Sequence, residues 1–147
     1  MDKWQVICIA DLKAFKGKEK SIANLEAELA EIKSRCGSIP AMRYDKERTS
    51  GGEPHNPADQ WLNDLVLREE IEAQLRAVRF EVVKVRRVLD QLTEEERAVL
   101  GGFYMNRSNR YIDRLIGTLH LERSSIYRLK DRALANYALI AYGFTSY

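Results

Sequence analysis

The residues best suited to chemistry in this chain are the basic and hydroxyl side chains between positions 107 and 132. This stretch holds seven Lys and Arg residues against three Asp and Glu residues, whereas the whole chain of 147 residues has a formal net charge of only +2. A local positive surplus on a nearly neutral protein indicates a polyanion partner such as a nucleic acid. A charged helical surface that only keeps the protein soluble is the alternative.

The pattern of residues 110–135, RYIDRLIGTLHLERSSIYRLKDRALA, is typical of two short helices joined by a tight turn. Leu121 would anchor the turn, and Ile126 would anchor the second helix five residues later. In a helix-turn-helix the outer side of the second helix enters the major groove, where Arg can bond guanine and hydroxyl groups can reach phosphate. The residues that we expect to contact DNA are Arg110, Arg123, Ser124, Ser125, Tyr127, Arg128 and Arg132.

Other combinations of residues do not support catalysis or metal binding. His55, His120, Cys8 and Cys36 are too scattered in the sequence to form a metal-ligand motif. The acidic residues 94–96 are explained by helix capping, and the sequence has neither a phosphate-binding glycine loop of the GxxxxGK[ST] type nor a nucleophile elbow. We therefore expect no enzyme activity, no cofactor and no bound metal.

Two long helices are predicted ahead of this region, because hydrophobic residues recur there at alternating spacings of three and four. The first stripe contains Phe15, Ile22, Leu25, Leu29, Ile32 and Cys36, with one gap at Lys18. The second contains Ile71, Leu75, Val78, Val82, Val85, Leu89 and Leu92. The two helices could pair as an antiparallel hairpin of one chain, or two copies could pair as a homodimer. The sequence leaves both arrangements open.

The connection between the long helices is predicted over residues 37–57, which contain all three prolines. At its end Pro57 suits the first position of a helix, with Asn56 as its cap. We thus expect an all-α protein, in which residues 1–92 form a coiled-coil-like helical pair and residues 93–147 form a helix-turn-helix DNA-binding domain.

The predicted second domain opens with a capping box. The Thr93 hydroxyl would accept a backbone N–H bond, and the Glu96 carboxylate would bond a second backbone N–H. This helix is expected to reach about Met105. Gly101 and Gly102 lie inside it, so they should either kink the helix or let another backbone approach.

The end of the chain is aromatic, with Tyr137, Tyr142, Phe144 and Tyr147. We expect these rings to close the core under the DNA-binding helices, and a contact surface for a second copy or a polymerase is the alternative. The apolar run over residues 6–10 is too short for a membrane span or a signal peptide. With only two cysteines, a cytoplasmic protein without membrane contact is expected.

Residues 92–137, from LTEEERAVLGGFYMNR to RLKDRALANY, resemble the DNA-binding region of sigma-factor region 4 and phage regulators. Together with the SGGEPHNP segment and the long central helix, they resemble phage late-gene transcriptional activators of the ArpU/RinA type. The resemblance implies a phage or prophage regulator that binds promoter DNA and activates transcription. It departs from the family at Ile116, His120 and Glu122, where a small residue, Gly and Ser are usual.

The function expected from the sequence is therefore sequence-specific binding of double-stranded DNA for transcriptional control in the bacterial host cytoplasm. The heptad helices would make a dimer or present the protein to a partner such as host RNA polymerase. One alternative is a DNA-packaging recognition subunit of a phage, similar to a small terminase. Another is a helical interaction or scaffold protein without a DNA role.

Overall fold

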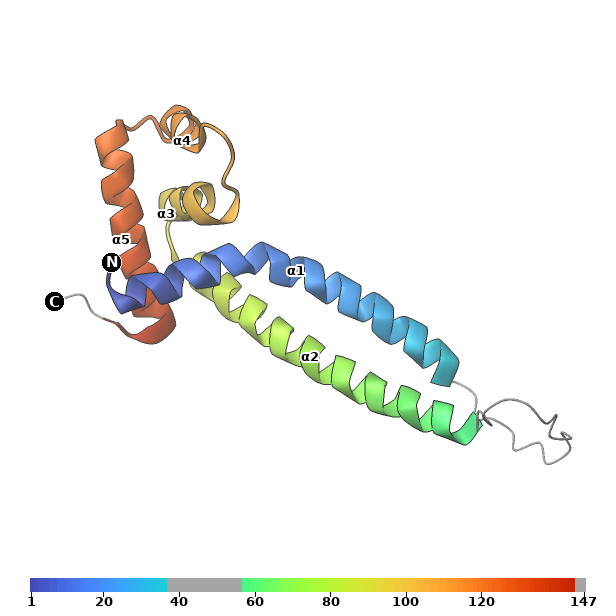
Figure 1. Ribbon diagram of the computed structural model, residues 1–147. Coiled ribbons are helices and arrows are strands. Elements are labelled where there is room, and N and C mark those ends of the chain that lie inside the picture. The colour runs from blue at the N-terminus through green and yellow to red at the C-terminus, as the bar shows by residue number, and fades with distance from the viewer. Residues whose placement is uncertain (37–56, 145–147) are drawn as a thin grey trace, which may run out of the picture. The chain divides into compact units, whose positions relative to one another are not determined.

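The structure, a computed structural model, describes residues 1–36 and 57–144. Within these ranges the chain is helical and has no strand, which confirms the predicted all-α class for the described residues. Figure 1 shows the elements in chain order. They are α1 (Lys3–Cys36), α2 (Pro57–Gln91), α3 (Glu94–Leu100), the π-helical turn η1 (Gly101–Met105), α4 (Tyr111–Leu119) and α5 (Arg123–Tyr142).

The start and end of α2 agree with the local sequence signals. The helix begins at Pro57, as predicted, because the fixed φ of proline suits the first helical position. It ends at Gln91, one residue before the last predicted heptad position. Apart from Pro57, the predicted connection over residues 37–57 and its Asn56 cap lie outside the described residues.

The chain divides into two compact units. One unit combines Met1–Lys20 with Arg79–Tyr147, and the other covers Ser21–Val78. This division follows contacts in space, so each unit draws on both long helices. The boundary between residues 1–92 and 93–147 stays a prediction about domains.

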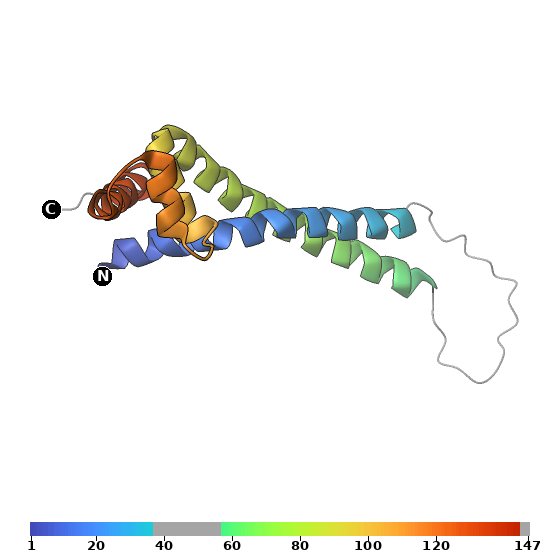
Figure 2. The same cartoon turned by 90° about the horizontal axis from the view of Figure 1, so that it is seen from above.

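In the Ser21–Val78 unit, the last part of α1 lies beside the first part of α2 (Figures 1 and 2). Ile32, Ile71 and Leu75 are buried here, and Leu25 and Leu29 are half-buried. These are heptad positions of the two predicted stripes. The stripes therefore cover one another within a single chain in this unit.

In the other unit, the first part of α1 and the last part of α2 run past each other in opposite directions (Figure 2). Two ion pairs of 2.7 Å join the helices, between Lys18 and Glu81 and between Glu19 and Arg86. Exposed pairs of this kind stabilise by at most about 1 kcal/mol, so buried apolar residues must supply most of the packing energy. Of the two arrangements left open by the sequence, the structure contains the intramolecular hairpin.

The buried face of α1 in this unit extends further towards the N-terminus than the predicted stripe. Cys8 and Leu12 are fully buried, and they continue the spacing of four and three that leads to Phe15. Burial, and next the nearby Asp11 carboxylate, raises the pKa of the Cys8 thiol to about 11. Cys8 therefore behaves as a small core residue here.

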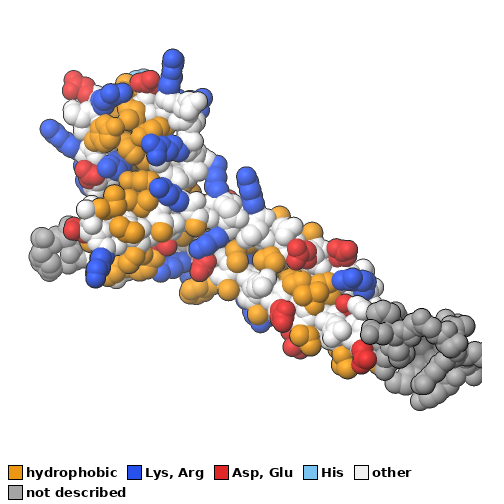
Figure 3. Space-filling model, in the orientation of Figure 1, with side chains coloured by type: hydrophobic (Ala, Val, Ile, Leu, Met, Phe, Trp, Pro, Cys, Tyr) orange, Lys and Arg blue, Asp and Glu red, His pale blue; other side chains and the backbone are white. Residues whose placement is uncertain are grey.

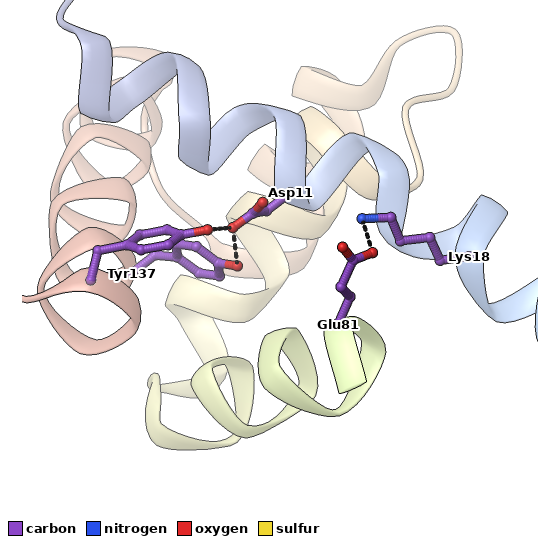
Figure 4. Close-up of polar contacts among 5 residues, drawn as sticks. Asp11, Lys18, Glu81 and Tyr137 are labelled. Carbon is purple, nitrogen blue, oxygen red and sulfur yellow. Dashed lines mark hydrogen bonds and ion pairs between the residues drawn. The ribbon is translucent and has the colours of Figure 1, made fainter. Parts of the chain in front are cut away.

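The aromatic end of α5 meets α1 at Asp11 (Figure 4). The Tyr137 hydroxyl donates to Asp11 Oδ2 at 3.3 Å, and the Tyr142 hydroxyl donates to the same oxygen. Tyr137 is fully buried, and Tyr142 stacks on Phe144 with 5.4 Å between ring centroids. Tyr137 therefore belongs to the core, as predicted, whereas Tyr142 is half-buried and Phe144 is exposed. Tyr147 lies outside the described residues.

The predicted third helix changes form at its glycines. It runs as an α-helix to Leu100 and continues as the π-helical turn η1 to Met105. A Cβ atom built on Gly102 would lie 2.9 Å from Leu115 Cδ1 and 3.1 Å from Leu115 Cγ. Of the two predicted alternatives, the change to a π-helical turn agrees with a kink at the glycines, and the nearest neighbour of Gly102 is a side chain of α4 and not another backbone.

The capping box at the start of α3 is only partly as predicted. Thr93 Oγ1 accepts the Glu96 N–H at 3.2 Å, which confirms the N-cap. The Glu96 carboxylate does not bond a backbone N–H. It accepts from the Thr93 hydroxyl at 3.1 Å and from Asn136 Nδ2 of α5 at 2.8 Å. The buried Glu96 carboxylate therefore links α3 to α5 in addition to its bond with the N-cap residue.

The two glycines of η1 provide a matched test of this packing. Gly101→Ala should raise the free energy of unfolding by about 0.4–1 kcal/mol, since Gly101 has helical φ and ψ and nothing lies within 4 Å of the new methyl group. Gly102→Ala should lower it, because crowding against buried Leu115 costs about 1–3 kcal/mol. Urea unfolding of both variants measures the difference. Equal stabilisation by the two substitutions would show that Leu115 does not pack on Gly102.

The raised pKa of the Tyr137 phenol predicts that the protein loses stability at alkaline pH. Burial, and next the Asp11 carboxylate, raises its pKa above the ordinary value of 10.0. Above about pH 10 the unfolded phenol loses its proton while the folded one keeps it, so stability falls as pH rises. In Tyr137→Phe this fall should be shallower, although the lost hydrogen bond costs about 0.5–1.5 kcal/mol at neutral pH. Urea unfolding across the alkaline range checks this, and an unchanged slope would contradict it.

Candidate nucleic-acid interface

Helices α4 and α5 are joined by the three residues 120–122. His120 takes the left-handed conformation, with φ of 55°, and its N–H donates to the Ile116 carbonyl at 3.0 Å. Glu122 is extended, and its carbonyl accepts the Ile126 N–H at 3.0 Å to open α5. The left-handed region costs a non-glycine residue such as His120 about 1–2 kcal/mol, so glycine would fit this position with less strain.

One side of α5 is buried against the rest of its unit. The buried residues recur at the three- and four-residue spacing of one helix face. They are Ile126, Leu129, Ala133, Leu134, Tyr137 and Ala138. Ile126, Ala133 and Tyr137 have no exposed surface at all. The bond between Asn136 and Glu96 holds the same helix against α3. The rotation of α5 about its own axis is therefore fixed.

The opposite side of α5 carries Ser124, Arg128 and Arg132, whereas Arg123 is the first residue of the helix and lies in line with the buried Leu134. Arg123, Ser124, Arg128 and Arg132 are exposed, and Ser125 is half-buried. No ion pair joins Arg128 or Arg132 to any carboxylate in the described ranges, so their N–H groups are available to a ligand. The structure thus places these five residues in the first half of one helix.

Two further predicted residues, Arg110 and Tyr127, lie in different surroundings. Arg110 is exposed just before α4, where it takes the left-handed conformation with φ of 61°. Tyr127 is 39% exposed, and its ring meets Phe103 edge-on with 5.6 Å between centroids. The ring of Tyr127 therefore belongs to the packing between α5 and η1, and its outer edge faces solvent.

Phe103 is the centre of this aromatic cluster. Tyr111 of α4 also meets it edge-on at 5.1 Å, and the Lys130 ammonium lies 5.6 Å from its ring centroid. Burial lowers the pKa of Lys130, but a bond of 2.9 Å to Asp131 and the nearby Tyr104 phenol raise it by more, so the net shift is upward. Lys130 therefore stays charged and balances Asp131, the acidic residue among the arginines of α5.

A cleft of about 340 Å³ lies beside the exposed side of α5. Its lining residues come from the first turn of α3, the turn before α5 and α5 itself: Glu95, Leu121, Ser125, Arg128, Leu129 and Arg132. Ser125, Arg128 and Arg132 were predicted as contact residues, whereas Glu95 was assigned only to capping. Glu95 is 33 positions from Arg128 in the sequence, so no local pattern could predict that the two residues line the same cleft.

The surface around this site is mixed. Figure 3 shows Lys and Arg side chains spread around exposed hydrophobic atoms over α3, α4 and α5 on the face in view. Single basic groups between apolar atoms suit contacts to individual phosphates and bases. They differ from a continuous positive field, which would attract any polyanion.

Among residues 1–36 and 57–144, no group of three or more His, Cys, Asp and Glu side chains could hold a metal ion. None of the helices in these ranges is both long and apolar enough to cross a membrane.

Comparisons with known proteins add no relative to this picture. No protein-family model, no curated protein and no solved structure matches the chain significantly. The candidate site is thus defined by its own geometry.

Proposed function

We propose that this chain binds double-stranded DNA through a helix-turn-helix made of α4 and α5. The observation that carries the proposal is the division of α5 into a buried apolar side and an exposed side that presents Ser124, Arg128 and Arg132. Such a helix is about 10–12 Å across with its side chains, and the major groove of B-DNA is about 12 Å wide. The exposed side of α5 therefore fits the groove.

Different residues would serve different contacts in this complex. Arg128 lies in the second turn of α5, on the same side as Arg132 one turn later. Its guanidinium can donate two bonds to the O6 and N7 atoms of guanine. Ser124 and Ser125 lie in the first turn of α5, where hydroxyl groups and free backbone N–H groups can bind phosphate. Arg110 and Arg123 supply further positive charge for the sugar-phosphate backbone.

In the cell, this activity would serve transcriptional regulation, as the resemblance to phage late-gene activators of the ArpU/RinA type implies. A sigma region 4-like module could bring the protein and host RNA polymerase to one promoter. Since the heptad positions of α2 are covered within one chain, they do not argue for a dimer. Binding of two copies to repeated half-sites stays a separate part of the proposal.

Arg128→Ala tests the assignment of the recognition helix. Because Arg128 is exposed, the variant should keep its helicity and melting temperature. It should bind the preferred duplex more weakly by about 1–3 kcal/mol and discriminate less at one base position. Arg87→Ala removes the same charge from an exposed site on α2. It should change neither the affinity for the preferred duplex nor the discrimination between bases.

The preferred duplex is obtained by selection from random DNA, and affinity is then measured across a series of salt concentrations. The logarithm of the wild-type affinity should fall with the logarithm of salt, with a slope of about −0.9 for each phosphate neutralised. Failure of the wild-type protein to bind any duplex at low salt would end the proposal. Equal binding by Arg128→Ala and the wild type would reject only the role of Arg128.

A further inference from the structure

The cleft beside α5 combines hydrogen-bond donors with an acceptor, which gives it a chemical preference. Arg128 and Arg132 can only donate, the ionised Glu95 carboxylate can only accept, and the Ser125 hydroxyl can do both. A site for phosphate alone would need no acceptor, and a carboxylate near a phosphate repels it. The lining therefore matches a ligand that presents both acceptors and a donor.

The major-groove edge of a G·C pair has this combination. Guanine presents two adjacent acceptors, O6 and N7, which fit the paired N–H groups of one arginine, and cytosine presents the N4 amino group, which a glutamate can accept. An A·T pair has no two adjacent acceptors on one base, so it does not satisfy an arginine in the same way. The ligand that fits best is therefore a G·C pair.

Accordingly, we infer that this cleft reads a G·C base pair, with Arg128 donating to guanine and Glu95 accepting from cytosine N4. This inference rests on the proposed DNA-binding function. In this complex Glu95, at the start of α3, determines specificity together with the base-reading residues of α5. With Arg132 included, the cleft holds two guanidinium groups and one carboxylate. Its net charge is therefore positive, and the site still attracts DNA.

The surroundings of the cleft favour selective reading over loose attraction. Leu129 is buried and Leu121 is half-buried, so part of the lining is apolar. A polar group without a hydrogen-bond partner against an apolar lining costs free energy. A wrong base would leave Glu95 or Arg128 without such a partner. Glu95 forms no ion pair with Arg128 or Arg132 in the described structure, so these groups need not first be separated before DNA binds.

The test compares Glu95→Gln with the matched control Glu94→Gln. Both substitutions remove one exposed carboxylate from the first turn of α3, but only Glu95 lines the cleft. Duplexes are selected from a randomised library with the wild type and each variant, and melting confirms that all three proteins are folded. Affinities are then measured for the selected duplex and for the duplex with C·G replaced by T·A at the position in question.

The wild type and Glu94→Gln should prefer the C·G duplex by about 5- to 150-fold, the range of one good base contact. Glu95→Gln should lose the part of this preference that comes from the cytosine, because the Gln amide can donate to thymine O4 and the Glu carboxylate cannot, whereas Arg128 still favours guanine. If the wild type binds DNA but Glu95→Gln keeps the same preference as Glu94→Gln, the inference is overturned and DNA binding stands. If the wild type binds no duplex, the proposed function fails and the inference fails with it.

Discussion

The burial of one side of α5 is the constraint on which the candidate site depends. Ile126, Ala133 and Tyr137 have no exposed surface, so the helix cannot turn about its axis without bringing apolar groups into water. Helical periodicity then leaves Arg128 and Arg132 on the outside. The basic side that we propose as the DNA-reading surface is therefore a consequence of core packing, and it exists before any ligand binds.

Polar contacts from distant parts of the unit hold α5 in this orientation. Asn136 bonds the buried Glu96 of α3, and Tyr137 bonds Asp11 of α1. The close fit of Leu115 against Gly102 sets how near α4 comes to η1. These contacts join α1, α3, α4 and α5 around one core, which is why the start of α5 and the start of α3 can line a common cleft.

Local structure was largely predictable from the sequence, because its signals are local. Pro57 and Thr93 mark helix starts, the spacing around Ile126 identifies the buried side of α5, and the tight turn at His120 follows from the break in apolar periodicity. The meeting of Asp11 with Tyr137 spans 126 positions, and no pattern in the sequence encodes such a contact. The same holds for Glu95 at the cleft. Cys8 and Leu12, by contrast, continue the heptad spacing, so their burial could have been predicted.

Whether DNA meets the exposed side of α5 is tested by mapping backbone amide resonances during titration with the selected duplex. We expect the largest changes in resonance position on residues 123–132, with smaller ones at Glu95 and Arg110. Amides of the Ser21–Val78 unit should stay unchanged. Changes concentrated on α2, with none at the start of α5, would contradict the account.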